Sequence, residues 1–312
     1  MDKNSTELEK ASRFSVGEFL FDILRGFGIG VAFIIPGFSG GSVAAILGIY
    51  EKLVGAIADI FKNFKKSVAT LLPIFLGMVI GIVSLLYPLG WALGKFPFPT
   101  VCIFVGLAIG GLPSITDKLH SQKIKVTNAV AFLIPLICAA ALSFLPLSGD
   151  VNLFKLNFGG YLLLVIIGVV GSAALVVPGI SGSMLLLIFG YYNPIVNLIT
   201  NHLLKGNDVG ISILVLGCTG FGIIVGFILI SKLMKFLLSA CPRGTYFAIL
   251  GFIIGSIPTV YISTAKDAGY TLSTLPTSVI HWVMCVVMLA VGFVLSFALV
   301  LYSKRLANKK ER

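Results

Sequence analysis

Ten long apolar segments, separated by short polar or charged stretches, restrict this chain to a helical fold in a membrane. The segments lie at roughly 19–35, 42–61, 68–93, 100–115, 126–147, 159–178, 182–199, 209–238, 245–262 and 279–303. Several of them exceed the ~20 residues that a helix needs to cross a bilayer. Charged residues make up only 11% of the chain, compared with about 25% in soluble domains. We therefore expect an all-α integral membrane protein.

The second half of the sequence repeats the first. A turn of sequence Pro-Gly-Phe-Ser-Gly-Gly-Ser returns as Pro-Gly-Ile-Ser-Gly-Ser 142 residues later, and GLAIGGLP returns as GFIIGSIP after 145 residues. These stretches are 36–42 and 178–183 for the turn, and 106–113 and 251–258 for the second match. A shift of only three residues over this distance indicates an internal duplication. It predicts two repeats, 17–147 and 159–303, with five segments each.

The basic residues predict the orientation of these repeats. If the N-terminus lies inside and the segments alternate, 17 of the 23 Lys and Arg residues lie on the cytoplasmic side and four lie outside. An odd number of segments inverts the second repeat relative to the first, as in many secondary transporters. The lead-in 1–16 and the basic tail 304–312 are then cytoplasmic, and the linker 148–158 is extracytoplasmic.

The first two segments are too short to cross the membrane separately. Ten uncharged residues separate Arg25 from Pro36 and eight separate Ser42 from Glu51, so each arm reaches about 12–15 Å, roughly half of a ~30 Å hydrocarbon core. We expect a re-entrant helical hairpin here and, by the repeat, a second one, although the second copy is long enough to span. The predicted tips are 36–42 and 178–184. Each repeat then has one hairpin and three transmembrane helices; ten short crossings are the alternative.

The two tips have the composition of an anion site. An apolar helical arm follows each turn, so its free N-terminal amides and positive dipole end face the membrane interior. Serine hydroxyls add donors, and glycines let an anion approach the backbone. The predicted phosphate-binding residues are Ser39, Gly40, Gly41, Ser42, Ser181, Gly182, Ser183 and Arg25. The alternative is that the small residues only permit tight helix packing, with Arg25 paired to Asp22 at the membrane surface.

Three residues beside the tips are candidates for coupling or gating: Glu51, Tyr50 and Tyr192. Glu51 would bind a coupling proton or sodium ion, or else pair with Lys52 or cap a helix. The two tyrosines are expected at the level of the membrane interface. No Cys-x-x-Cys pair occurs and the three histidines are dispersed, so we expect no metal and no cofactor. The basic residues form no face with interleaved aromatic residues, which argues against a nucleic-acid partner.

The doubled turn also resembles a known family. With Gly-Ile-Tyr-Glu at 48–51 and Gly-Tyr-Tyr at 190–192, it is similar to the bacterial polyprenyl-phosphate transporters, formerly a domain of unknown function, over about 17–302. The resemblance implies a flippase of the bacterial plasma membrane that returns undecaprenyl phosphate from the outer to the inner leaflet for cell-wall polymer synthesis. Its partners would be the lipid substrate and the bilayer. Family members often carry a polar residue three places before the first Pro, where this chain has Phe33.

Two other functions remain open from the sequence. A membrane polyprenyl-pyrophosphate phosphatase is one, because such a family shares inverted repeats and a Pro-Gly-x-Ser turn. That family carries Arg after the Ser and paired catalytic Glu residues, whereas this chain has Gly40 and Gly182 there and only twelve acidic residues. A carrier for a small soluble anion is the other, and the long apolar arms fit a prenyl chain better. We predict a transporter and no enzyme.

Overall fold

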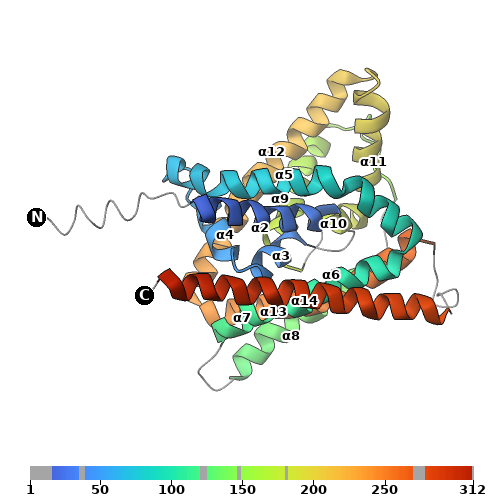
Figure 1. Ribbon diagram of the computed structural model, residues 1–312. Coiled ribbons are helices and arrows are strands. Elements are labelled where there is room, and N and C mark those ends of the chain that lie inside the picture. Colours follow the sequence, from blue (N-terminus) through green and yellow to red (C-terminus); the bar gives the residue numbers. More distant parts are fainter. Residues whose placement is uncertain are drawn as a thin grey trace, which may run out of the picture.

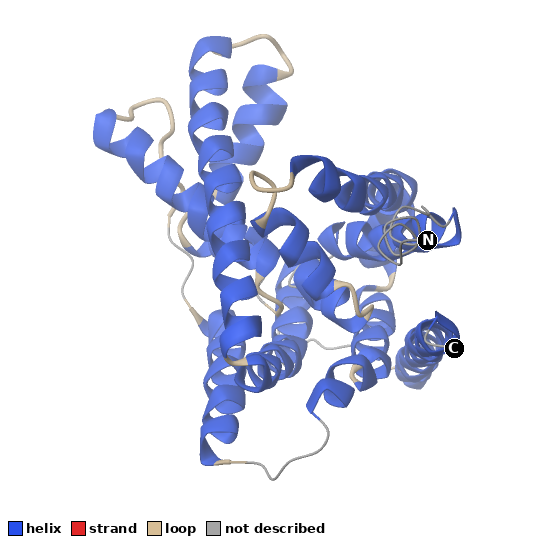
Figure 2. Ribbon diagram, turned by 90° about the vertical axis from the view of Figure 1, so that its left-hand side faces the viewer, coloured by secondary structure: helices blue, strands red, loops and turns tan. Residues whose placement is uncertain are grey.

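The computed structural model of the protein is helical throughout the part of the chain that it describes, which comprises residues 16–34, 39–119, 125–145, 149–179, 182–269 and 278–310. No strand occurs in these ranges (Figures 1 and 2). The first residues of α2 and the last residues of α14 lie at the same end of the molecule, at the left of Figure 1. The predicted all-α fold is confirmed.

The two halves have the same order of long and short helices. The first half contains α2 (Val16–Ile34), α3 (Gly40–Ile46), α4 (Tyr50–Ala58), α5 (Phe64–Lys95), α6 (Pro97–Gly111), α7 (Pro113–Thr116), η1 (Asp117–Leu119), α8 (Val126–Ala141) and η2 (Leu142–Phe144). The second contains α9 (Phe158–Val176), α10 (Gly182–Ile188), α11 (Tyr192–Asn197), the π-helix η3 (Leu198–Leu203), α12 (Val209–Ala240), α13 (Pro242–Asp267) and α14 (Val279–Lys310).

A glycine ends the short helix after each tip, so the predicted continuous arms 42–61 and 182–199 are each broken in two. Gly48 has a φ of 70° and Gly190 a φ of 74°, a left-handed conformation that favours glycine. In both turns the amide after the glycine donates to the carbonyl five residues earlier, over 3.0 Å and 2.9 Å. This pattern is a Schellman C-cap. The match between Gly48 and Gly190 is therefore structural as well as sequential.

Repeated glycines let the long helices pack with their backbones in contact. Helix α5 packs against α2, and α12 packs against α9. A Cβ at Gly77 of α5 would lie 2.0 Å from the carbonyl oxygen of Ile23, and one at Gly222 of α12 would lie 2.1 Å from that of Val165. Only glycine fits at such distances. Gly77 and Gly222 occupy matching positions of the sequence duplication, so the same contact is built twice.

The remaining long helices pair between the two halves. Helix α6 of the first half packs along α14 of the second, and α8 packs along α13 (Figure 1). Glycines again permit the contact, since a Cβ at Gly106 or at Gly251 would lie 2.1 Å from a carbonyl oxygen of the partner helix. Each half therefore contributes helices to the packing of the other.

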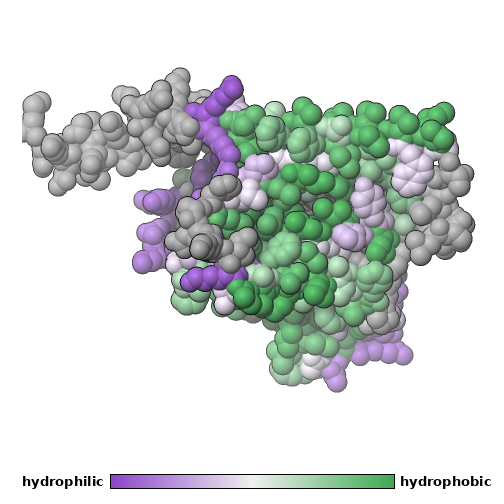
Figure 3. Space-filling model, turned by 90° about the horizontal axis from the view of Figure 1, so that it is seen from below, coloured by the Kyte–Doolittle hydropathy of each residue, from purple (hydrophilic) through white to green (hydrophobic). Residues whose placement is uncertain are grey.

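Within the described part of the chain, five helices are long and apolar enough to cross a membrane. They are Phe64–Lys95, Pro97–Leu119, Val209–Ala240, Pro242–Ala265 and Val279–Tyr302. The sequence predicts a sixth crossing at 126–147, but α8 has 16 residues and continues only as the short 3-10 turn η2. Figure 3 shows hydrophobic side chains over most of one face and hydrophilic ones at its left edge and at its lower right. This surface is typical of a membrane protein.

Candidate functional site

The two predicted tips meet in the interior of the protein. The Ser42 hydroxyl accepts a hydrogen bond of 2.6 Å from the amide of Gly179, and the Ser39 hydroxyl lies 3.5 Å from the carbonyl oxygen of Val177, to which it donates. Ser42 is 1% exposed and Ser39 is 4% exposed. Two turns that are distant in the sequence therefore form one buried polar junction between α3 and the end of α9.

The other predicted tip residues are placed as follows. Gly40 and Gly41 form the buried start of α3, and Gly182 begins α10. Ser181 lies outside the described residues. Ser183 belongs to α10, but its side chain is also outside the described part. Of the predicted serines, the structure thus places Ser39 and Ser42 against the other tip.

An aromatic ring covers the first turn of α3. A Cβ at Gly40 would lie 2.7 Å from Cζ of Phe33, so the ring fills the space beside this glycine. Phe33 is the residue that stands where the resembled family often carries a polar side chain. In this conformation, an anion that approached the Gly40 backbone from that side would first have to displace the Phe33 ring.

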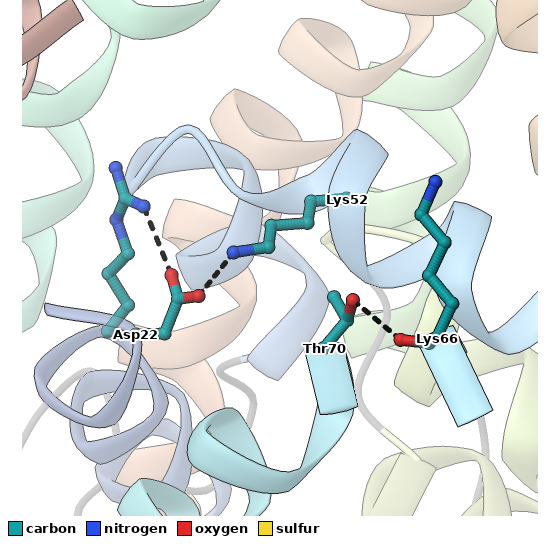
Figure 4. Close-up of polar contacts among 5 residues, drawn as sticks. Asp22, Lys52, Lys66 and Thr70 are labelled. Carbon is teal, nitrogen blue, oxygen red and sulfur yellow. Dashed lines mark hydrogen bonds and ion pairs between the residues drawn. The ribbon is translucent and has the colours of Figure 1, made fainter. Parts of the chain in front are cut away.

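Arg25 forms an ion pair with Asp22, which is one of the two roles that the sequence predicts for it. Its Nη1 lies 3.3 Å from Oδ1 of Asp22, and its guanidinium lies 4.2 Å above the ring of Phe21. The other carboxylate oxygen of Asp22 accepts a hydrogen bond from Lys52 (Figure 4). Asp22 is 4% exposed, so a buried carboxylate holds two cations beside it.

Glu51 pairs with a different lysine from the one expected. Its Oε1 lies 3.3 Å from the ammonium of Lys118 and accepts a hydrogen bond from the hydroxyl of Tyr246. Lys52 instead contacts Asp22, so the expected pairing of Glu51 with Lys52 is wrong. Glu51 and Lys52 are consecutive residues of α4, and consecutive side chains of a helix point in different directions. Glu51 consequently links the first half of the chain to α13 in the second.

The two candidate tyrosines differ in their surroundings. Tyr50 is 3% exposed, and among the described residues its hydroxyl has no hydrogen-bond partner. Burial within the protein does not determine depth in a bilayer, so the interfacial position of Tyr50 and Tyr192 stays a prediction. Tyr192 is 37% exposed, whereas the preceding Tyr191 is 5% exposed. The buried tyrosine of the second half is thus one residue earlier than the duplication predicts.

A cavity of about 710 Å³ lies among α2, α3, α5, α6, α7, η1 and α14, next to the buried junction of the two tips. Most side chains that line it are apolar. Its charged lining residues are Arg25, Asp117, Lys118 and Lys304. Lys304 of α14 forms an ion pair with Asp117 of η1, so an ion pair joins the two halves here in addition to the hydrogen bond of Tyr246 to Glu51. The volume is within the ~300–1,000 Å³ typical of ligand sites.

Within the described residues, no group of three or more His, Cys, Asp or Glu side chains could hold a metal ion. The carboxylates of Asp22, Glu51, Asp59 and Asp117 each lie against a lysine or arginine. The geometry offers cations, hydroxyls and backbone donors around an apolar space. Such an arrangement can bind an anionic amphiphile.

The sequence model of a family described as "VCA0040-like: Undecaprenyl phosphate translocase-like" matches residues 29–275. The chain belongs to this family. It is 32% identical over 282 residues to the polyprenyl-phosphate transporter of Staphylococcus aureus (strain NCTC 8325 / PS 47), covering 89% of this chain and 95% of the relative. The polyprenyl-phosphate transporter of Vibrio cholerae serotype O1 (strain ATCC 39315 / El Tor Inaba N16961) is 23% identical over 260 residues, or 78% of each chain. No solved structure matches significantly.

For this member of the family, sequence reasoning missed part of the charged site. Lys118 and Lys304 contribute only to the topology prediction, and Asp117 and Tyr246 belong to no site predicted from the sequence. Their signal is weak, because each stands at or near the end of an apolar segment, where charged and aromatic residues are ordinary membrane anchors. Only the fold brings them to one place, from η1, α13 and α14.

Proposed function

We propose that this protein carries polyprenyl phosphate across the bacterial cell membrane, returning undecaprenyl phosphate from the outer to the inner leaflet for reuse in cell-wall polymer synthesis. The observation that carries the proposal is the buried contact of Ser42 with Gly179, which joins the two repeated turns in a chain of this family. Both relatives described above are named as polyprenyl-phosphate transporters. The apolar cavity beside the junction fits an amphiphilic substrate better than a soluble anion.

The proposed architecture has two inverted repeats, each with a re-entrant hairpin that ends at a tip. Three observations support it. The glycine contacts of α2 with α5 recur between α9 and α12, both short helices after the tips end in the same cap, and the basic residues favour one side of the predicted topology. Hairpins that enter from opposite leaflets would meet near the midplane, where inverted-repeat transporters bind their substrates.

In the proposed mechanism, the phosphate replaces contacts that the tips make with each other. The Ser42 hydroxyl and the Gly179 amide would turn from one another toward the phosphate oxygens. Ser39 would act with them, together with Ser181, Gly182 and Ser183 from the second tip. Because each half supplies one tip, relative movement of the halves would expose the site to one leaflet at a time.

Glu51 is the proposed point of coupling to a proton or sodium ion. It holds Lys118 and Tyr246, so loss of its negative charge would release a contact between the halves. A Glu51→Gln variant should therefore lose the dependence of transport on the coupling ion. A variant that retains this dependence would exclude the role.

The test is translocation by the purified protein in liposomes. Labelled polyprenyl phosphate is placed in one leaflet, and its arrival in the other is followed with a reagent that does not cross the membrane. We expect faster arrival than in empty liposomes and no acceleration for the uncharged polyprenol. Equal rates with and without protein would overturn the proposal. Release of inorganic phosphate from polyprenyl pyrophosphate would identify a phosphatase instead.

A further inference from the structure

The cavity beside the tips has an apolar body and one charged end. Its lining on α2 runs from Phe21 to Ala32, which corresponds to about 16 Å of helix. The other walls include Leu85 and Leu89 of α5 and Leu107 of α6. The lining on α2 alone is therefore about half as long as a ~30 Å hydrocarbon core is thick. A space of this length is suited to a hydrocarbon chain rather than to a compact solute.

The charged end is positive. The charged lining residues are three cations, Arg25, Lys118 and Lys304, and one carboxylate, Asp117, so their formal sum is +2. If the neighbouring Asp22, Glu51 and Lys52 are counted as well, the sum is +1. A phosphate monoester carries about −1.5 to −2 at neutral pH. The charge of this end thus complements a phosphate group at the end of an apolar chain.

The cavity reaches the apolar surface of the protein between α2 and α14. Leu24 of α2 and Leu295 of α14 both line it, and they are 51% and 52% exposed. The ring of Phe21 contacts that of Tyr302, with centroids 5.7 Å apart, and closes the gap between the helices at one point. A lipid can therefore enter from the side between α2 and α14, without passing through water.

Two residues that line the cavity have buried, apolar counterparts in the second half. Arg25 corresponds to Ile167, which is 6% exposed, and Leu89 corresponds to Met234, which is packed in the hydrophobic core at 7% exposure. The predicted topology places Lys118 and Lys304 on the cytoplasmic side. The charged end of the cavity, formed by α2, η1 and α14, thus lies on the predicted cytoplasmic side.

We propose that this cavity binds polyprenyl phosphate on the cytoplasmic side of the transport cycle. The part of the prenyl chain nearest the phosphate lies along the apolar walls, and the phosphate lies among Arg25, Lys118 and Lys304. Binding displaces the carboxylates of Glu51 and Asp117 from the two lysines. This assignment rests on the proposed function, and it adds a second, charged binding site to the one at the tips.

The first experiment measures binding without transport. The full-length protein in detergent is cross-linked to a polyprenyl phosphate that carries a photoactivatable group near its phosphate end, and the adducts are mapped. We expect adducts on lining residues of α2, α5 and α14. Unlabelled polyprenyl phosphate should compete at least tenfold better than either polyprenol or inorganic phosphate. Adducts confined to outward-facing residues would overturn the proposal, as would equal competition by polyprenol or by phosphate alone.

Two matched substitutions on α5 test the apolar body. Leu89→Trp fills the cavity, whereas Leu86→Trp adds the same side chain at a position that is 56% exposed. We expect at least tenfold weaker cross-linking for Leu89→Trp and no change for Leu86→Trp, with both proteins eluting as folded monodisperse species. Equal cross-linking in the two variants would contradict the assignment.

The charged end is tested with Lys118→Gln, with Lys95→Gln at the exposed end of α5 as the control. Lys118→Gln should weaken binding of polyprenyl phosphate several-fold and leave that of polyprenol unchanged, while Lys95→Gln changes neither.

Parallel translocation assays separate the proposed binding site from the proposed function. If Leu89→Trp transports at the wild-type rate, the cavity is not on the route but the proposed function stands. If the wild-type protein binds lipid here and never translocates it, the proposed function fails and the binding site stands.

Discussion

Ser42 accepts a buried hydrogen bond from the backbone of a residue that is 137 positions away in the sequence. The sequence predicts this serine as a donor to an anion, because a hydroxyl beside glycines at a helix start is a common feature of anion sites. It does not reveal Gly179 as the partner, since that contact depends on how the two halves pack. A hydroxyl can form either contact, so the same atom can hold the tips together and later bind substrate.

Removing this hydroxyl should destabilise the protein. Ser42→Ala leaves the buried amide of Gly179 without its acceptor, which costs about 1–3 kcal/mol. We expect a lower thermal midpoint in detergent. Ser84→Ala is the control, because Ser84 is exposed and its hydroxyl donates within its own helix, to Ile80. Equal thermal midpoints for Ser42→Ala and Ser84→Ala would show that the contact between the tips contributes nothing to stability.

The contact of Asp59 with Lys235 gives a prediction about pH. A hydrogen bond from Lys235, aided by nearby lysine charges, lowers the pKa of the Asp59 carboxyl below its ordinary value. A carboxyl whose pKa is lowered by folding adds stability above its unfolded pKa of about 3.9, and this stability disappears as the pH falls through the folded pKa. Asp59→Asn should therefore lower the thermal midpoint slightly at pH 7 and not at strongly acidic pH. A difference that grows on acidification would contradict this.

The short helices α3 and α10 show how far local sequence determines an element. Their breaks at Gly48 and Gly190 follow from glycine in a left-handed turn, and the repeated sequence marks both positions. The partners of the long helices could not be predicted in the same way. The glycines of α6 indicate a close neighbour, but every glycine-rich helix offers the same backbone surface. Its pairing with α14 therefore depends on the packing of all the helices together.

Glycine substitutions on α5 test the close packing of this helix. Gly77→Ala places a Cβ 2.0 Å from the carbonyl oxygen of Ile23, so α2 and α5 must separate. Overpacking of this kind costs about 1–3 kcal/mol. Gly90→Ala on the same helix meets open space and should be neutral or stabilising by up to about 1 kcal/mol. Thermal midpoints that change equally in the two variants would contradict the packing described here.

Two ion pairs and a hydrogen bond to a carboxylate join the two halves. Asp59 contacts Lys235, Asp117 contacts Lys304, and Glu51 accepts from Tyr246. The sequence predicts that most of these residues share the cytoplasmic side, because basic residues gather there. It could not predict the cavity, whose walls come from six α-helices and the 3-10 turn η1 and whose charged end comes from three separate segments. A cavity is a property of side chains packed in three dimensions and leaves no periodic pattern in a sequence.

The predicted topology can be checked with single cysteines in a background without the five native ones. Asn63→Cys lies at the start of α5, on the predicted cytoplasmic side, and Asn207→Cys lies before α12, on the predicted outer side. A thiol reagent that does not cross the membrane should label position 207 in intact cells and position 63 only after lysis. Labelling of both positions in intact cells would refute the inverted arrangement.

Transport by a variant without the two central tip hydroxyls tests the shared site most directly. Ser39→Ala and Ser181→Ala each remove one hydroxyl from one tip, and the double variant removes both. In liposomes with labelled polyprenyl phosphate in one leaflet, we expect each single variant to slow translocation and the double variant to reduce it at least tenfold, while the proteins remain folded. Translocation by the folded double variant at the wild-type rate would contradict a phosphate site formed by the two tips.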